Sequence, residues 1–216
     1  MAGTDRPRRC VIVGGAGIGD YASVRRYLRE DDFNIFCDSG LNHREGLGIA
    51  PHLIVGDFDS HDNPHLEVET IVLPREKDDT DTVFAVKEAL RRGFADFLLL
   101  GAAGARLDHT LGNLSILLML HRRGKRALLV DDYSEMEIAA AKPVEIDGSY
   151  PFFSLLNISG TAKGITIENA KYPLRDAVID CTYQYGVSNE VLPGRRARVS
   201  VREGELLLVK VRREGL

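Results

Sequence analysis

Short apolar runs alternate with segments of helical periodicity through the first 132 residues of the chain. The runs that have the length and composition of strands are residues 10–13, 34–37, 53–55, 70–73, 97–100 and 127–130. The segments with helical periodicity are residues 20–30, 81–92 and 108–123. Strands that alternate with helices in this way form a largely parallel sheet covered on both faces, because each parallel connection crosses over through a helix. We therefore predict an α/β fold of Rossmann-like type over residues 1–132.

The pattern changes after Asp132 to short strand-like runs separated by turn residues. These runs are residues 137–140, 152–158, 164–168, 177–181, 198–201 and 206–211. Several short strands at regular spacing indicate an antiparallel sandwich or barrel. We predict a C-terminal β-sandwich domain over residues 133–216, with a tight hairpin turn at Glu203-Gly204 between its last two strands.

Charge and cysteine content narrow the classes of function. The formal net charge is −4, and the basic pairs Arg91-Arg92 and Arg122-Arg123 fall where predicted helices end, which suits the helix dipole. This charge pattern argues against a nucleic-acid partner. Three scattered cysteines indicate a reducing compartment, and no apolar run is long enough to span a bilayer. We expect a cytoplasmic protein with no membrane partner.

Acidic residues follow four of the predicted strands. The segments that carry them begin at Asp38, at Asp57-Phe58-Asp59, at Lys77-Asp78 and at Gly104. Ligands of open α/β sheets bind beyond the carboxyl ends of the strands, so these acids are expected at one edge. Such a cluster is costly without a cation, and Mg²⁺ prefers carboxylate oxygens together with substrate phosphates. The alternative is that each acid serves as a turn residue or a helix cap, which explains single positions better than the whole set.

Phosphate-binding loops give a less specific signal. The glycine-rich segment at residues 14–20 lacks the third glycine of the dinucleotide fingerprint, because Asp20 stands at that position, and the chain has no G-x-x-x-x-G-K-[ST] motif. Backbone N–H groups of the segment can still meet a phosphate. Lys77, Arg106 and a metal ion would supply the positive charge. His109 is the one histidine within the acidic edge, whereas His61 and His65 are separated by a proline that disfavours a helical zinc pair.

Five ordered motifs resemble those of the thiamine pyrophosphokinase family. They are Asp38-Ser39-Gly40, Gly56-Asp57-Phe58-Asp59-Ser60, Lys77-Asp78-x-Thr80-Asp81, Gly104-x-Arg106-x-Asp108-His109 with Asn113, and Tyr185-Gly186-Val187-Ser188-Asn189-Glu190. The second motif is highly specific, while the others are weak alone. The resemblance spans most of the chain and implies an ATP- and metal-binding α/β domain, a β-sandwich that binds thiamine and dimerises, and a homodimer with thiamine between subunits.

The resemblance also assigns roles by position. The implied Mg²⁺ ligands are Asp57, Asp59 and Asp81, which together with Arg106 form the implied catalytic set. The implied ATP-binding residues are Asp38, Lys77, Asp78, Thr80, Arg106, Asp108, His109 and Asn113. The implied contacts with the thiamine pyrimidine are Ser188 and Asn189.

This sequence departs from the family pattern at several places. Ser39 and Leu41 replace glycine and alanine, Ala105 replaces a common glycine, and Gly112 replaces a common alanine, all of which concern loop geometry more than chemistry. The chain has no tryptophan to stack on thiamine. The aromatic residues expected to substitute for it are Tyr183, Tyr185, Phe152 or Phe153.

The implied reaction is an in-line attack of the thiamine hydroxyl on the β-phosphorus of Mg·ATP, with AMP as the leaving group. Asp81 or Asp59 could accept the hydroxyl proton, and the sequence does not decide between them. A rival function is a metal-dependent phosphatase with Asp57 as nucleophile and Asp59 as acid and base. Another is a non-catalytic protein that binds a nucleotide or thiamine.

Overall fold

The computed structural model describes residues 9–58, 67–74, 76, 78–104 and 106–212. The chain divides into two compact units, Met1–Asp132 and Tyr133–Leu216, here called the N-terminal and C-terminal units.

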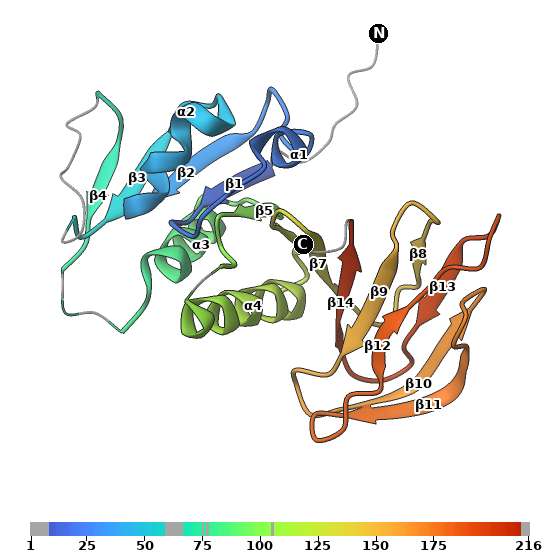
Figure 1. Cartoon of the computed structure of the whole chain (residues 1–216). Coiled ribbons are helices and arrows are strands. Elements are labelled where there is room, and N and C mark those ends of the chain that lie inside the picture. Colours follow the sequence, from blue (N-terminus) through green and yellow to red (C-terminus); the bar gives the residue numbers. More distant parts are fainter. Residues whose placement is uncertain (1–8, 59–66, 75, 77, 105, 213–216) are drawn as a thin grey trace, which may run out of the picture. The chain divides into compact units, whose positions relative to one another are not determined.

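The N-terminal unit contains six parallel strands in the order β6-β5-β1-β2-β3-β4 (Figure 1). Their bounds are Arg9–Val13 for β1, Phe33–Cys37 for β2, Leu53–Gly56 for β3, Thr70–Val72 for β4, Asp96–Leu100 for β5 and Arg126–Val130 for β6. The predicted parallel α/β sheet is confirmed. The chain runs outward from β1 to β4 and then returns to build β5 and β6 on the other side of β1. The strand order therefore reverses between β1 and β5, which is where α/β sheets bind ligands.

Helices cover both faces of this sheet (Figure 1). Their bounds are Tyr21–Arg25 for α1, Arg44–Leu47 for α2, Asp81–Arg91 for α3 and Leu107–Arg122 for α4, and a 3₁₀ helix, η1, spans Asp38–His43. Val24 of α1 and Leu47 of α2 pack in one core cluster with Val11 and Val13 of β1. Helix α3 contacts β1, β2, β3 and α4. Two helix ends follow the sequence signals, since the Thr80 hydroxyl accepts from the Val83 amide at 3.3 Å to cap α3, and Gly124 beyond α4 takes a φ of 67°.

The helix predicted over residues 20–30 ends early, at Arg25. The guanidinium of Arg9 donates to the carbonyl of Tyr27, and the Asp32 carboxylate accepts from the Arg29 amide at 2.8 Å. Asp32 is in turn held by Arg9 at 2.7 Å, with both side chains buried. These partners satisfy the backbone without further helical turns, and helical periodicity alone does not reveal them.

The C-terminal unit is built from two four-stranded antiparallel arrays, β12-β9-β14-β7 and β11-β10-β13-β8. Their strands are β7 (Ser134–Ala139), β8 (Val144–Ile146), β9 (Phe152–Leu156), β10 (Thr161–Glu168), β11 (Leu174–Asp180), β12 (Gly186–Asn189), β13 (Ala197–Ser200) and β14 (Leu206–Val211). Phe153 and Leu155 of β9 share one buried cluster with Ile165, Ile179 and Val199 of the other array. The two arrays thus face each other, and the predicted β-sandwich is confirmed.

The predicted hairpin at Glu203-Gly204 is wrong. Strand β13 pairs with β10 and β8, whereas β14 pairs with β7 and β9, so the turn carries the chain from one array to the other. The amide and carbonyl of Glu203 both bond to Lys163 of β10, at 3.1 and 2.9 Å. The turn residues suit a hairpin and a crossover equally well, so local sequence cannot distinguish them.

One end of the sandwich interior is charged. Glu135 and Glu137 lie on the same side of β7 as the core residue Ala139, and Lys210 of β14 reaches both carboxylates at 2.9 Å. The Tyr150 hydroxyl donates to Glu135 at 2.7 Å. Burial alone would lower the pKa of Lys210, but the charges of Glu137 and Glu135 outweigh it and raise that pKa. The Lys210 side chain therefore carries a buried positive charge that is matched by its partners.

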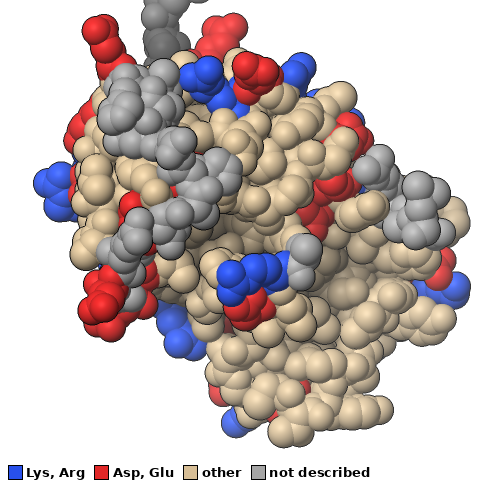
Figure 2. Space-filling view, turned by 60° about the vertical axis from the view of Figure 1, so that its left-hand side comes forward, with Lys and Arg blue, Asp and Glu red and all other residues tan. Residues whose placement is uncertain are grey.

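Among the described residues, no helix has the length and apolar content required to cross a membrane. On the face drawn in Figure 2, the described Lys and Arg side chains are interspersed with acidic ones over a mostly uncharged surface.

Candidate functional site

A cavity of about 640 Å³ opens in the N-terminal unit where the strand order reverses. Its lining comes from the segments that follow β1, β2, β3 and β5 and from the first turns of α3 and α4. The lining residues are Gly15, Ala16, Gly17, Cys37, Asp38, Ser39, Asp57, Thr80, Asp81, Thr82, Gly101, Ala102, Arg106, His109, Thr110 and Asn113. The position agrees with the rule that α/β sheets bind ligands at the carboxyl ends of their strands.

Three carboxylates meet in this cavity. Asp38 begins η1 directly after β2, Asp57 follows β3, and Asp81 is the first residue of α3. One carboxylate oxygen from each lies within 4.8 Å of the other two. Gly56 makes room for this approach, because a Cβ there would stand 3.1 Å from the Cβ of Asp38.

Backbone geometry at the cluster is unusual as well. Asp38 and Phe58 both take positive φ, at 34° and 52°, a conformation that costs non-glycine residues energy and collects at functional sites. Asp38 is buried, with 7% of its surface exposed. Three ionised carboxylates at this range repel, and a hard divalent cation with oxygen ligands is the arrangement that relieves the repulsion. The donor set fits Mg²⁺.

The structure brings together two of the three expected metal ligands, Asp57 and Asp81. Asp59 lies outside the described residues. Asp38, which the family resemblance places on the ATP side, completes the cluster. The signal for it was its position directly after a strand that neighbours β3, since adjacent parallel strands end at the same edge.

Cys37 lines the same cavity but offers no reactive thiolate. Burial, followed by the negative charge of Asp81, raises the pKa of its thiol far above the usual range. A neutral thiol is a poor nucleophile and a poor metal ligand, so Cys37 acts as a small apolar wall.

Of the described residues near the start of α3 that were expected to bind ATP, one lines the cavity and one does not. Thr80 lines the cavity and caps α3. Asp78 is exposed and does not line the cavity, and its neighbour Asp79 pairs with Lys87 at 2.5 Å. Lys77 lies outside the described residues.

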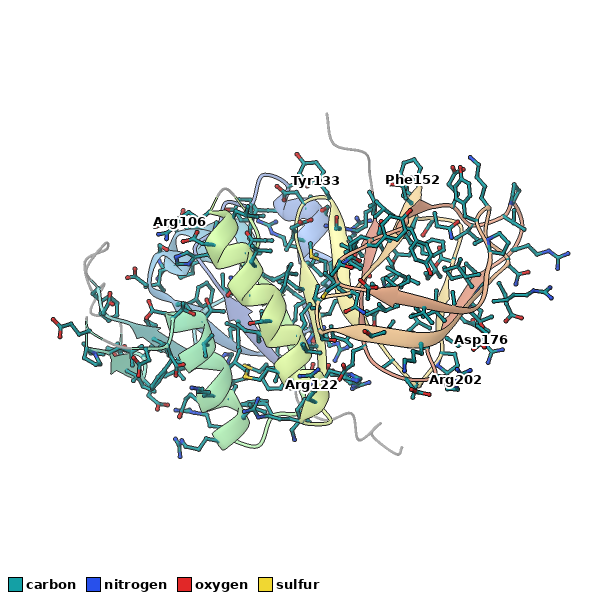
Figure 3. The ribbon with its side chains drawn as sticks, turned by 90° about the horizontal axis from the view of Figure 1, so that it is seen from below. Arg106, Arg122, Tyr133, Phe152, Asp176 and Arg202 are labelled. Carbon is teal, nitrogen blue, oxygen red and sulfur yellow. The ribbon has the colours of Figure 1, made fainter. Side chains whose placement is uncertain are left out.

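Arg106 and Asp108 form a two-bond ion pair where α4 begins. The guanidinium donates to the two carboxylate oxygens at 3.2 and 2.6 Å, and both side chains are exposed. The hydrogen bonds from Arg106 lower the pKa of Asp108 to about 2. Figure 3 shows Arg106 at the opposite end of α4 from Arg122. Arg106 and His109 line the cavity, which places a cation at its rim.

Asn113 and Thr110 hold the loop that follows β5. The buried Asn113 donates through Nδ2 to the carbonyl of Ala102 at 2.7 Å. The Thr110 hydroxyl accepts from the Gly104 amide at 3.0 Å. Asn113, which was expected to bind ATP, lines the cavity with its amide directed at the protein backbone. Thr110 was missed, because a single threonine in the first turn of a helix carries no distinctive sequence signal.

The glycine loop, defined as residues 14–20, lines the cavity through Gly15, Ala16 and Gly17. The Gly14 amide donates to the Leu100 carbonyl and the Ala16 amide to the Gly101 carbonyl, both at 2.8 Å. A Cβ on Gly15 would overlap the Ser39 hydroxyl, so the glycine is needed for close packing. The helix that follows has only five residues.

Ser188 and Asn189, the residues expected to bind thiamine, lie in β12 of the C-terminal unit. Asn189 is buried, and its Oδ1 accepts from the amides of Tyr172 and Glu190 at 3.0 and 2.9 Å. Its Nδ2 donates to the Tyr172 carbonyl at 2.8 Å. Ser188 is exposed and has a φ of 56°. Of this pair, Ser188 is the exposed residue.

The four aromatic candidates for stacking separate clearly. Tyr183 and Tyr185 are exposed, with ring centroids 5.5 Å apart. Phe152 is half-buried. Phe153 has no exposed surface and belongs to the sandwich core, so its proposed stacking on thiamine is wrong. Alternation along β9 explains the difference, because neighbouring residues of a strand face opposite sides.

Comparison with known proteins matches both units. Residues 24–129 match the model of the thiamin pyrophosphokinase catalytic domain, and residues 137–206 match that of the thiamin pyrophosphokinase vitamin B1 binding domain. The thiamine pyrophosphokinase of Bacillus subtilis (strain 168) is 26% identical over 207 residues, which cover 92% of this chain and 96% of that protein.

Solved structures agree with these matches. The crystal structure of thiamine pyrophosphokinase from Bacillus subtilis superimposes with a TM-score of 0.81 at 26% identity, covering 94% of this chain and 99% of that one. The thiamin pyrophosphokinase from Geobacillus thermodenitrificans gives a TM-score of 0.79 at 26% identity, covering 94% and 97%.

Proposed function

Because this chain belongs to the thiamine pyrophosphokinase family, we propose that it transfers pyrophosphate from Mg·ATP to the hydroxyl of thiamine, giving thiamine diphosphate and AMP. The observation that supports this reaction best is the meeting of Asp38, Asp57 and Asp81 in one cavity at the reversal of strand order. The attack of a neutral hydroxyl on a polyphosphate needs a site that holds a cation against the phosphate charge and aligns the two reacting groups. Three carboxylates that could bind such a cation meet this need.

Asp38, Asp57 and Asp81 would hold Mg²⁺, and Asp59 stays a proposed fourth carboxylate. When bound, the ion would supply positive charge that offsets the phosphate oxygens. The three acids reach the cavity from β2, β3 and α3, which are rigidly packed elements, so their oxygens are preorganised rather than assembled on binding. Asp81 or Asp59 would accept the proton of the attacking hydroxyl.

On the ATP side, we assign phosphate contacts to Arg106, Lys77 and the amides of Gly15 and Gly17 in the glycine loop. Arg106 would exchange Asp108 for a phosphate, since a guanidinium binds both groups through the same two-bond geometry. Asp108 then orients Arg106 before ATP arrives. Asp78 and His109 remain proposed ATP contacts. Thr80 and Asn113 act by fixing α3 and the loop after β5.

Thiamine binding is assigned to the C-terminal unit. The proposed contacts are the hydroxyl of Ser188, with Asn189 holding the strand beside it, and the exposed rings of Tyr183 and Tyr185. An aromatic face suits a cationic thiazolium ring. The proposal includes a homodimer in which the thiamine site lies at the subunit interface, and a cytoplasmic location.

A product assay tests the reaction. Incubation with Mg·ATP and thiamine should yield thiamine diphosphate and AMP in equal amounts. ADP with thiamine monophosphate would indicate transfer of a single phosphoryl group and contradict the proposal. Free phosphate without a thiamine product would favour the phosphatase, and binding without turnover would favour a sensor.

A further inference from the structure

The glycine loop is held by two side chains that do not themselves line the cavity, His43 and Asp132. Both bond to the backbone of the loop, and they come from opposite sides of the strand reversal. His43 ends η1 after β2, and Asp132 follows β6. Neither residue belongs to the sequence motifs, and neither has a role in the reaction described above.

His43 fixes the carbonyl of Ala16. It is buried, with 6% of its surface exposed, and its Nε2 lies 2.9 Å from that carbonyl oxygen. A carbonyl only accepts, so Nε2 carries the proton, and in a neutral ring Nδ1 is then an acceptor. The Tyr21 hydroxyl lies 2.8 Å from Nδ1 and donates to it. Burial is the largest influence on the pKa of His43 and lowers it, against the effects of Ala16 and Asp132, which favours the neutral ring.

The direction of this carbonyl determines the direction of the next amide. The peptide between Ala16 and Gly17 is planar and trans, so its N–H points away from its C=O and hence away from His43. Gly15 and Gly17 line the cavity. Among the hydrogen bonds of the described part of the chain, none uses the amides of these two glycines. Both N–H groups are available to an anion in the cavity.

Asp132 occupies the amides at the far end of the loop. Its two carboxylate oxygens accept from Gly19 at 2.7 Å and from Asp20 at 3.0 Å. Asp20 in turn caps α1 by accepting from the Ser23 amide at 3.1 Å. The loop is therefore divided, with the amides of Gly19 and Asp20 bonded to Asp132 and with Gly15 and Gly17 in the lining of the cavity.

We propose that His43 and Asp132 are positioning residues, which clamp the glycine loop so that the amides of Gly15 and Gly17 meet the phosphates of ATP. The inference rests on the proposed function, because it takes Mg·ATP as the ligand. The clamp substitutes for the missing nucleotide-binding glycine motifs. Backbone N–H groups bind phosphate well only when they are held in one orientation, and here two side chains provide the restraint.

The first experiment compares His43→Leu with His43→Gln, using calorimetry of Mg·ATP without thiamine and steady-state kinetics. Leucine fills the buried space without a donor, whereas glutamine keeps an N–H. His43→Leu should raise the ATP Kd and KM about five- to tenfold, the loss expected from one hydrogen bond, while the thiamine KM stays constant. His43→Gln should recover most of the affinity. The matched control is His52→Leu, because His52 is exposed, also bonds to backbone, and does not line the cavity.

A folded His43→Leu variant with wild-type ATP affinity would overturn the role of His43. The same conclusion would follow if His43→Gln bound ATP as weakly as His43→Leu, since the donor would then be irrelevant. A purely structural role would lower the melting temperature of the variant without separating the two KM values.

The second experiment compares Asp132→Asn with Asp132→Ala and does not depend on the folding of the His43 variants. Both substitutions remove the negative charge, but only asparagine keeps an oxygen that accepts from a loop amide. The Asn variant should therefore bind Mg·ATP several-fold more tightly than the Ala variant. Equal Kd values would contradict the clamp. Wild-type protein that fails to bind Mg·ATP would instead overturn the proposed function, so the two failures are distinguishable.

Discussion

The side-chain amide of Asn189 and the backbone of Tyr172 form a reciprocal pair, in which Nδ2 donates to the Tyr172 carbonyl at 2.8 Å and Oδ1 accepts its amide at 3.0 Å. A third bond, from the Glu190 amide, completes the set. The side-chain amide of Asn189 therefore joins β12 to the backbone of Tyr172, in the way that a pair of backbone hydrogen bonds joins two strands. Because Oδ1 and Nδ2 of Asn189 already bond to backbone, they are poorly placed to bind thiamine as well. Ser188 is therefore the better candidate for a contact with thiamine.

Substitutions of this pair should separate stability from binding. Asn189→Ala removes a buried side chain that makes three hydrogen bonds to backbone groups, and should lower the free energy of unfolding by about 1–3 kcal/mol. Ser188→Ala removes an exposed hydroxyl and should leave stability unchanged while raising the thiamine KM. Thermal unfolding and steady-state kinetics of both variants check this. An unchanged thiamine KM in Ser188→Ala would remove Ser188 from the site.

The carboxylate cluster should control both metal dependence and rate. Asp38→Asn, Asp57→Asn and Asp81→Asn each remove a charge at nearly constant volume, and each should lower kcat/KM by roughly 10²-fold or more. Titrations of activity with Mg²⁺ should show that each variant needs a higher Mg²⁺ concentration than wild type to reach half of its maximal rate. Asp79→Asn is the matched control, because Asp79 lies two residues before Asp81 but pairs with Lys87 and does not line the cavity. Near wild-type activity in all three cluster variants would show that the metal site lies elsewhere.

Two neighbouring glycines should respond oppositely to alanine. A Cβ on Gly15 overlaps the Ser39 side chain, so Gly15→Ala should destabilise the N-terminal unit by about 1–3 kcal/mol. A Cβ on Gly17 meets no atom of the described residues within 4 Å, and Gly17 lines the cavity. Gly17→Ala should therefore keep the wild-type melting temperature and weaken ATP binding. Calorimetry and thermal unfolding on both variants distinguish packing from ligand contact.

Acid should weaken the N-terminal unit through Glu88. Hydrogen bonds from Arg91 and then Arg92 lower the pKa of Glu88 from 4.5 to about 2 in the folded protein. A depressed folded pKa stabilises the fold above the unfolded pKa, and this contribution is lost as the pH falls from about 4.5 towards 2. Glu88→Gln should be less stable than wild type at pH 6, and the difference should shrink as the pH falls to 3. Urea unfolding across this range measures it, and a constant difference would contradict the ion-pair origin.

The charged end of the sandwich should be sensitive to loss of Lys210. Lys210→Met leaves the buried Glu135 beside the partly exposed Glu137 without a cation, which should cost about 3–5 kcal/mol. Lys171→Met is the control, because Lys171 forms an exposed pair with Glu190 and should change stability by less than about 1 kcal/mol. Chemical denaturation of both variants tests the contrast, and equal losses would mean that burial does not govern these pairs.

Sequence patterns predicted the strands of the parallel sheet well, because β1, β2, β3 and β5 are largely buried runs of mostly apolar residues. Helix α1 was overestimated, since Arg9, distant in sequence, binds the carbonyl of Tyr27 and ends the helical path. The short strands β8 and β12 were missed for a different reason. Strands of three and four residues are too brief for alternation to show.

The residues of the site could be predicted where they follow directly from the ends of strands. They could not be predicted where a side chain contributes by a hydrogen bond to the backbone of a distant segment. Asp57 and Asp81 follow directly from the edge rule. Asp38 was found as a residue but assigned to ATP, because sequence does not report how closely two loops approach. Thr110 and His43 were missed, since a residue that bonds to a remote carbonyl leaves no local pattern.

The glycine loop and the loop after β5 touch through Gly14 and Gly101. A Cβ on Gly14 would stand 2.6 Å from the carbonyl oxygen of Gly101, and a Cβ on Gly101 would overlap that of Gly14. These two positions are thus linked in any effort to redesign the cavity for another ligand. A side chain at either glycine would push the other loop away from its place in the cavity wall. Variant libraries should therefore keep Gly14 and Gly101 fixed and vary Gly17, where a Cβ would meet no atom of the described residues within 4 Å.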